Sequence, residues 1–207
     1  MKRPKTSRAW WLDRHVHDPF VKLAQKEGYR SRAAYKLLWL DEKDHLLKPG
    51  MTVVDLGAAP GGWCQVAARK VGEKGRVIGI DLLPLDPIAG AILFQADFTS
   101  DEGLALVENA LEGRKADLVL SDMAPNLSGV KDADQAKHYA LAELALEFAV
   151  QWLKPEGAFV VKVFQGAGFE EFVRQARGVF RQINIRKPEA SRDESRENFL
   201  VGRGLKV

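Results

Sequence analysis

The feature that most constrains the fold is a regular alternation of two kinds of segment, which begins at Met51 and continues to the end of the chain. Short apolar runs such as 52–57 and 76–83 are typical of strands buried on both faces, whereas amphipathic segments such as 101–113 are typical of helices. Parallel strands need crossover connections, and a helix after each strand supplies them. The alternation therefore predicts a doubly wound, Rossmann-like α/β fold with a mostly parallel sheet and helices on both faces.

The apolar runs predict a seven-stranded sheet, with strands at 52–57, 76–83, 91–98, 116–123, 157–164, 183–188 and 197–204. The segments between them predict helices at 61–71, 101–113, 136–153 and 168–180. Two earlier helices are expected, one at 18–29 with Asp18 as its cap and Pro19 in its first turn, and one at 31–47 capped by Ser31. The turn at 48–50 then separates a basic N-terminal extension, 1–48, from the α/β domain, 49–207.

Positive charge is concentrated at the start of the chain. Residues 1–36 contain ten Lys or Arg against three Asp or Glu, although the 207-residue chain has a net charge of only +3. Such an asymmetry favours a polyanionic partner, and a solvated basic tail is the alternative. Residues 1–18 are expected to form a loose basic arm. Aromatic residues lie among these charges and favour a nucleic acid, because bases and sugars stack on aromatic rings: Trp10, Trp11, Phe20, Tyr29, Tyr35 and Trp39.

A glycine-rich turn, "GAAPGG" at 57–62, follows the first predicted strand. It is not a P-loop, because Trp63 and Cys64 stand where a phosphate-binding lysine and a magnesium-binding hydroxyl are required. It also departs from the dinucleotide fingerprint, since Ala59 replaces a glycine and Pro60 lacks an amide donor. The turn is therefore poorly suited to phosphate, although its glycines allow the backbone to approach a ligand closely.

Acidic residues occur at four successive predicted strand ends, and in open α/β sheets ligands bind beyond those ends. Any one of these acids is more typical of a cap, but four together favour a ligand with an adenosine, a cationic amino-acid arm and no phosphate. S-adenosylmethionine has this chemistry. Asp81 is expected to bind its ribose and Asp97 its adenine, with Phe98 against the ring. The candidate cofactor-binding residues from this pattern are Asp55, Gly57, Gly61, Gly62, Asp81, Asp97, Phe98 and Asp122.

Lys162 places a charge inside the apolar run "GAFVVKVF" at 157–164. A strand lysine usually extends its ammonium to water, which is the structural alternative here. Its apolar neighbours and the nearby Asp122 favour a functional role instead. Lys36, in the second N-terminal helix, and Glu197, at the start of the last strand, would carry no such meaning alone.

Six segments together resemble the RrmJ/FtsJ-type 2′-O-methyltransferases of bacterial 23S ribosomal RNA: "GYRSRAAYKL", "VVDLGAAPGGW", "DLLPLDPI", "SDMAPNLSG", "FVVKVFQG" and "RKPEASRDESRENFLV". The resemblance implies a catalytic Lys-Asp-Lys-Glu tetrad of Lys36, Asp122, Lys162 and Glu197. It also implies donor binding by Gly61, Trp63, Asp81, Asp97 and Asp122. The implied substrate is a uridine ribose in the A-loop of the peptidyl transferase centre, within the assembled large ribosomal subunit.

Two departures from the family pattern are mild. Cys64 stands where a serine is common, and "RDES" before Glu197 is acidic, which would weaken local contact with RNA. On this interpretation the RNA phosphates are held by Arg30, Arg32, Lys36, Arg186, Lys187, Arg192 and Arg196. Lys162 is either the general base or a charged group that orients the ribose, because burial and Lys36 would favour the neutral amine, whereas the two acids would favour the ammonium.

Two other functions remain open at this level. One is an RNA-associated factor that keeps the fold without catalysis. The other is a methyltransferase for proteins or small molecules, although Ala124 and the lack of an aromatic residue after Pro125 do not fit the amino-group methylase motif. The single cysteine and the absence of a long apolar run lead us to expect a cytoplasmic monomer with no membrane partner. The scattered histidines lead us to expect no metal.

Overall fold

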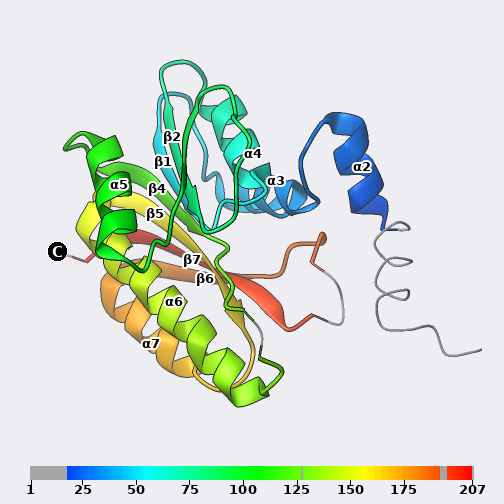
Figure 1. Ribbon diagram of the computed structural model, residues 1–207. Coiled ribbons are helices and arrows are strands. Elements are labelled where there is room, and N and C mark those ends of the chain that lie inside the picture. The colour runs from blue at the N-terminus through cyan, green and yellow to red at the C-terminus, as the bar shows by residue number, and fades with distance from the viewer. Residues whose placement is uncertain (1–17, 127, 192–194, 207) are drawn as a thin grey trace, which may run out of the picture.

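The computed structural model describes residues 18–126, 128–191 and 195–206. Within these ranges it contains one seven-stranded sheet in the order β3-β2-β1-β4-β5-β7-β6 (Figure 1). The predicted loose arm at 1–18 falls almost entirely outside the described residues, as does Arg192. The strands are β1 (Thr52–Leu56), β2 (Arg76–Asp81), β3 (Ala91–Gln95), β4 (Ala116–Ser121), β5 (Leu153–Phe164), β6 (Phe180–Arg186) and β7 (Glu197–Leu205).

The predicted doubly wound architecture is confirmed. Strands β3, β2, β1, β4 and β5 pair in parallel, whereas β7 runs antiparallel to both of its neighbours, β5 and β6. The chain builds outward from β1 through β2 to β3, and then returns to place β4 on the other side of β1. The carboxyl ends of β1 and β4 therefore form the point where strand order reverses, and ligands of such sheets bind there.

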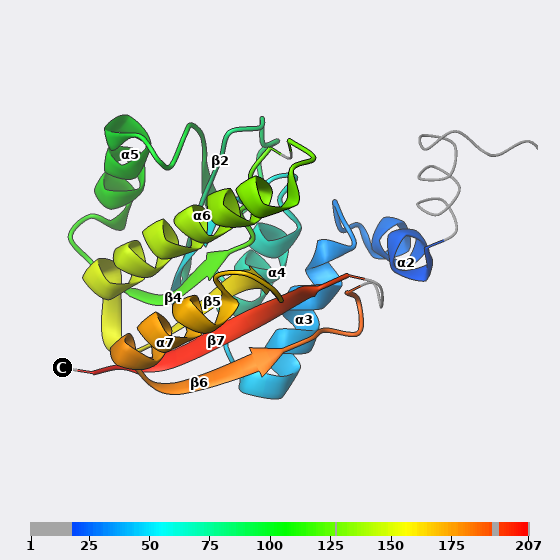
Figure 2. The same cartoon turned by 90° about the horizontal axis from the view of Figure 1, so that it is seen from below.

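Helices cover both faces of the sheet and create two hydrophobic cores. On one face lie α5 (Asp101–Leu111), α6 (Lys131–Trp152) and α7 (Phe169–Val179), which pack around buried side chains such as Ile80 and Phe159. On the other face lie α3 (Ala33–Asp44) and α4 (Gly62–Val71), which pack around Val53 and Leu120. Figure 2 shows α6 and α7 over one side of the sheet and α3 beyond its other side.

The two N-terminal helices differ in how they begin. Helix α2 (Pro19–Glu27) starts as predicted, with the Asp18 carboxylate accepting a hydrogen bond from the Phe20 amide at 3.0 Å. The prediction that Ser31 caps the next helix is wrong. Arg32 is the first flanking residue of α3, its backbone is already helical, and Ser31 contributes only its backbone carbonyl, which accepts from the Ala34 amide at 3.2 Å.

Helix α3 carries Lys36 and is anchored by fully buried Ala34, Leu37 and Leu40. The part of the N-terminal extension that bears this candidate residue is thus built into the core of the sheet, and burial of such side chains stabilises it by about 2 kcal/mol each.

Two element boundaries differ from the predicted ones by four residues or more. Helix α6 begins five residues earlier than expected, at Lys131, where the Asp134 carboxylate accepts from the Ser128 and Gly129 amides at 2.7 and 3.0 Å. Strand β5 also begins earlier, at Leu153, which pairs with Ala116, and its register against β4 shifts before the pairing resumes at Ala158. Within the described ranges, no helix combines the length and apolar character that a membrane span requires.

Candidate active site

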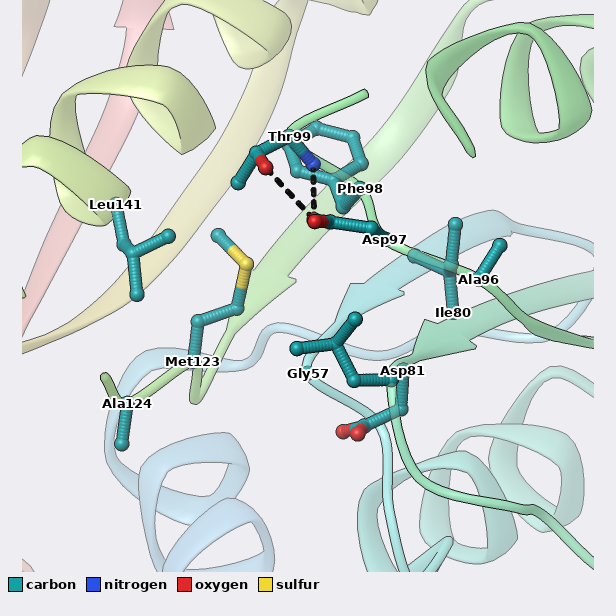
Figure 3. A pocket seen from close by; sticks show the side chains of 11 residues that line it. Gly57, Ile80, Asp81, Ala96, Asp97, Phe98, Thr99, Met123, Ala124 and Leu141 are labelled. Atoms are coloured by element: carbon teal, nitrogen blue, oxygen red, sulfur yellow. Dashed lines mark hydrogen bonds between the residues drawn. The ribbon is translucent and has the colours of Figure 1, made fainter. Parts of the chain in front are cut away.

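A cavity of about 100 Å³ opens where the strand order reverses (Figure 3). Its walls come from the turn after β1, the ends of β2 and β3, the loop after β4 and the middle of α6. The lining residues are Gly57, Ile80, Asp81, Leu82, Ala96, Asp97, Phe98, Thr99, Met123, Ala124 and Leu141. Among the predicted cofactor-binding residues, the structure thus brings four together in one cavity: Gly57, Asp81, Asp97 and Phe98.

Gly57 lies where the turn after β1 comes close to the loop after β4. Its φ of 81° lies in the left-handed region, and a Cβ there would come within 2.8 Å of the Met123 backbone N and Cα. The turn is tied to β2 because the Gly57 and Ala58 amides both donate to the Ile80 carbonyl. Only glycine fits this position, which keeps the cavity open between β1 and β4.

The two acids of the cavity are held by backbone and hydroxyl donors. Asp81 accepts from the Ala59 amide at 2.9 Å and from the Leu83 amide at 2.8 Å, one on each oxygen. Asp97 accepts from the Thr99 amide at 2.9 Å and from the Thr99 hydroxyl at 2.7 Å, both on Oδ1 (Figure 3). These bonds orient both carboxylates at the mouth of the cavity.

Within the described chain, the lining of the cavity offers groups that suit a nucleoside and none that suit a phosphate. Aliphatic and aromatic side chains, those of Ile80, Leu82, Phe98, Met123 and Leu141, supply surfaces for a base, while the two acids supply acceptors for hydroxyl and amino groups. No Lys or Arg is among the described lining residues, so a phosphate would have no cationic partner there. These lining groups suit an adenosine that carries a cationic arm, and S-adenosylmethionine has this chemistry.

Two of the predicted cofactor residues lie beneath the cavity. Asp55 is fully buried, accepts a hydrogen bond from the Cys64 thiol at 3.2 Å, and has its pKa raised to about 7 by that burial. Burial also raises the pKa of the Cys64 thiol well above its usual value. The Trp63 indole donates to the Ala33 carbonyl at 2.7 Å and packs against Phe199. Asp55 and the Trp63 side chain therefore support the site from below.

The remaining two glycines serve helix packing. A Cβ at Gly61 would come within 2.8 Å of Ile88, and one at Gly62 would come within 2.7 Å of the Ser31 hydroxyl. Gly61 is the first flanking residue of α4, with a φ of 110°. Both glycines let the start of α4 lie close to the segments on either side.

The four tetrad residues form two ion pairs. Lys162 Nζ lies 2.8 Å from the Asp122 carboxylate, and Lys36 Nζ lies 2.6 Å from the Glu197 carboxylate. Strand register explains the juxtaposition. Ser121 pairs with Val161 across β4 and β5, so Asp122 follows beside Lys162.

The second ion pair is brought beside the first by β7. Phe199 of this strand is the register partner of Lys162, and the Lys36 ammonium lies 5.6 Å from the centre of the Phe199 ring. Because β7 runs antiparallel, its first residue, Glu197, lies at the same end of the sheet as Asp122. The side chains of all four residues are between 9% and 21% exposed, where charges interact more strongly than in bulk water.

Comparison with known proteins identifies the family. The sequence profile described as "FtsJ-like methyltransferase" matches residues 29–205. The chain belongs to this family.

Relatives of this FtsJ-like methyltransferase are similar over nearly their whole length. A "Ribosomal RNA large subunit methyltransferase E" of Thiobacillus denitrificans is 61% identical, over 98% of this chain and 91% of the relative. One of Marinobacter nauticus with the same name is 56% identical over 100% of both. A crystal structure from Plasmodium falciparum, solved as a candidate ribosomal RNA methyltransferase, is 32% identical, with a TM-score of 0.76 over 86% of this chain and 98% of the other.

Most of the basic residues proposed to hold RNA make contacts within this FtsJ-like methyltransferase. The Arg30 guanidinium donates to three backbone carbonyls, those of Pro60, Asp86 and Pro87. Arg32 bonds to the Asp18 carboxylate and the Ala190 carbonyl, and Arg186 pairs with Asp44 at 2.8 Å. Lys187 donates to the Ser195 carbonyl at 3.0 Å. These contacts hold the loops around the tetrad in place.

Unlike the four basic residues above, Arg196 lines a second hollow, which lies beside the tetrad.

Sequence reasoning missed His138, which adjoins the tetrad of this FtsJ-like methyltransferase. Its ring is buried and its Nε2 lies 3.0 Å from the Lys162 carbonyl. Burial, followed by the charge of Lys162, lowers the pKa of His138 to about 4, so the ring is neutral at pH 7. Leu141 and Gln135 of the same helix were missed too. They lie at the site because of how α6 packs on the sheet, and the sequence pattern does not show this packing.

Proposed function

We propose that this chain transfers a methyl group from S-adenosylmethionine to the 2′-hydroxyl of a uridine ribose in 23S ribosomal RNA. The observation that carries the proposal is the pair of contacts between the Lys162 ammonium and Asp122, beside the cavity that holds Asp81 and Asp97. The relatives named as ribosomal RNA large subunit methyltransferases support the class of substrate. In this proposal the target is the A-loop uridine, within the assembled large subunit.

The donor would occupy the cavity, with Asp81 on its ribose hydroxyls and Asp97 on its adenine amino group. Its sulfonium supplies an electrophilic methyl carbon. Phe98, Leu82 and Leu141 would cover the base and exclude water from it. Met123 and Ala124 line the cavity on the side of Asp122, the next residue back in the chain, so the reacting carbon would face the tetrad.

Lys162 acts in this proposal as the charged group that orients the acceptor. Its ammonium donates to the Asp122 carbonyl and lies equally close to the Asp122 carboxylate. An ammonium has three N–H donors, so a third remains for the ribose oxygen. A donor held in the cavity would supply the methyl carbon to the ribose oxygen that Lys162 orients, and the hydroxyl proton would pass to solvent. Positioning supplies much of the lowering of the barrier.

The Lys36–Glu197 pair would hold the neighbouring part of the ribose. The two side chains line a hollow with Ser31, Arg32 and Ser195, and the Ser191 hydroxyl donates to Glu197 at 3.0 Å. Arg196, the residue before Glu197, lines the neighbouring hollow and would meet a phosphate on a single-stranded RNA segment. Such an enzyme acts in the cytoplasm, as a monomer.

The test uses large ribosomal subunits from cells that lack this protein. Wild type and Lys162→Ala are incubated with labelled S-adenosylmethionine, and the label is mapped to base or ribose. Ribose label that disappears in the variant supports the proposal. Label on a base, or transfer to ribosomal protein, contradicts it. A protein that binds the donor and labels nothing would favour a non-catalytic RNA factor.

A further inference from the structure

A second hollow, of about 370 Å³, opens next to the Lys162–Asp122 pair. Its walls come from the loop after β4, the start of α6, the end of β5 and the residue before β7. The lining residues are Ala124, Pro125, Lys131, Asp134, Gln135, His138, Phe164, Gln165 and Arg196. This hollow is separate from the cavity proposed to hold the methyl donor, although Ala124 lines both.

Three members of the tetrad adjoin the hollow through the chain itself. Ala124 follows Asp122 by two residues, Phe164 follows Lys162 by two, and Arg196 immediately precedes Glu197. The hollow is closed at its base by the Gln165 amide, which donates to the Arg196 carbonyl at 3.1 Å. The base attached to a ribose that is held at the tetrad would therefore lie close enough to enter the hollow.

Two of the residues that line the hollow, His138 and Gln135, each carry a buried polar atom without a partner among the described residues. His138 Nε2 donates to the Lys162 carbonyl, and the ring is neutral, so Nδ1 is a hydrogen-bond acceptor. That Nδ1 is buried and has no partner among the described residues, and the same holds for the side-chain Nε2 of Gln135, a donor one turn earlier on α6. Buried polar atoms are nearly always paired, so an unpaired acceptor and an unpaired donor on residues one helical turn apart, both lining one hollow, point to a ligand that would pair with them.

The chemistry of the hollow matches a nucleobase. Phe164, Pro125 and Ala124 offer apolar surfaces for the faces of a flat ring, and Lys131 and Arg196 stand at the rim, where phosphates would lie. The uracil edge presents an N–H donor beside a carbonyl acceptor, which complements His138 Nδ1 and Gln135 Nε2. We propose that this hollow receives the base of the nucleotide whose ribose is methylated, turned out of the RNA, and that Gln135 and His138 recognise it as uracil.

This inference rests on the proposed function, and its test measures preference between bases. The nucleotide that wild type methylates is first mapped on unmethylated large subunits. Subunits that carry cytidine at that nucleotide are then compared with native ones, by single-turnover methylation at limiting enzyme. We expect wild type to methylate the native subunits at least about tenfold faster, since one well-placed pair of base contacts discriminates by roughly this factor or more.

Gln135→Ala should reduce that preference to about threefold or less, because it removes one of the two contacts. Gln135→Glu replaces the donor with an acceptor and should act more severely on the native subunit. Gln151→Ala, at the exposed far end of the same helix, is the matched control and should keep the full preference. Donor affinity should be unchanged in all three. The preference is a ratio within one sample, so a variant that folds incompletely still reports it.

Wild type that methylates uridine and cytidine subunits equally would overturn the inference and leave the proposed function standing. So would a Gln135→Ala variant that keeps the full preference. Absence of methylation on any subunit by wild type would refute the proposed function and this inference together.

Discussion

The Lys162 ammonium contacts Asp122 twice, at 2.8 Å from its backbone carbonyl and at 2.8 Å from its carboxylate. Both acceptors come from one residue at the end of a buried strand, so the two groups are held in a fixed relative position. In this arrangement the ammonium donates a hydrogen bond to the carbonyl and forms an ion pair with the carboxylate. The arrangement favours Lys162 as an orienting charge over Lys162 as a general base.

This interpretation predicts different outcomes for two Lys162 variants. Lys162→Ala should lower the methylation rate by roughly 10²-fold or more, because a positioned charge at a reacting centre contributes on that scale. Lys162→Arg should keep part of the activity and the wild-type dependence of rate on pH, since the arginine is charged throughout. The measurement is single-turnover methylation between pH 6 and 9. An arginine variant as inactive as the alanine variant would instead favour Lys162 as the base.

Asp55 predicts a pH-dependent contribution to stability. Burial raises its pKa to about 7 in the folded protein, so the folded state binds a proton more tightly than the unfolded state. The stability that this proton provides is fully present below the unfolded pKa of about 4 and is lost as pH rises toward 7. Relative to Asp55→Asn, wild type should therefore lose about 2 to 3 kcal/mol of unfolding free energy between pH 5 and pH 7, at about 1.4 per unit.

Urea denaturation of both proteins across this pH range measures the difference. Glu156→Gln makes the same charge change at an exposed side chain and is the matched control. A difference between wild type and Asp55→Asn that stays constant with pH would show that Asp55 does not titrate in this range.

Alanine substitutions at Gly57 and Gly113 should distinguish the effect of blocking the cavity from the effect of backbone strain. Gly57→Ala places a methyl group against the Met123 backbone and should weaken donor binding roughly tenfold or more, because close-packed backbone has no room to move. Gly113→Ala imposes a similar positive φ with no atom within 4 Å of the new Cβ. It should cost about 1 kcal/mol of stability and leave donor binding unchanged. Calorimetric titration with S-adenosylmethionine compares them, and equal affinities would remove Gly57 from the donor site.

Two arginines should respond differently to salt. Arg30 already donates to three backbone carbonyls, so Arg30→Ala should lower the melting temperature and change the salt dependence of RNA binding little. Arg196→Ala should reduce the slope of log K against log salt by about 1, as expected for one phosphate contact. RNA affinity measured from low to moderate salt tests both, and the opposite assignment would follow if Arg30→Ala alone changed the slope.

Much of the fold follows from local patterns in the sequence, because buried parallel strands are continuously apolar and the helices between them are amphipathic. The strands β1, β2 and β4 are recognisable this way, and so are the acids Asp81, Asp97 and Asp122 that follow or end a strand. What local patterns do not contain is the order in which distant strands pair. The insertion of β7 between β5 and β6 places Glu197 beside Lys36, and no spacing along the chain indicates that contact.

Side-chain roles that depend on packing were harder to predict. Ser31 has the residue type of a cap, yet the backbone of Arg32 is helical already and the start of α4 lies against the Ser31 hydroxyl. Arg30 has the charge expected of a phosphate ligand, yet its guanidinium joins two loops. His138 lacks any motif, and its position below Lys162 follows only from the angle at which α6 crosses β5.

Because β7 is antiparallel, different parts of the chain would bind the methyl donor and the acceptor. In the proposed function, the ends of strands β1 to β4 contribute most of the cavity for the donor, whereas Arg196 and Glu197, at the start of β7, would lie on the acceptor side. Insertions or substitutions in that segment can reshape which acceptor is admitted while the nucleoside cavity stays intact. The fold thus allows acceptor choice to change by exchange of one peripheral connection, with the methyl-donating half retained as a common part.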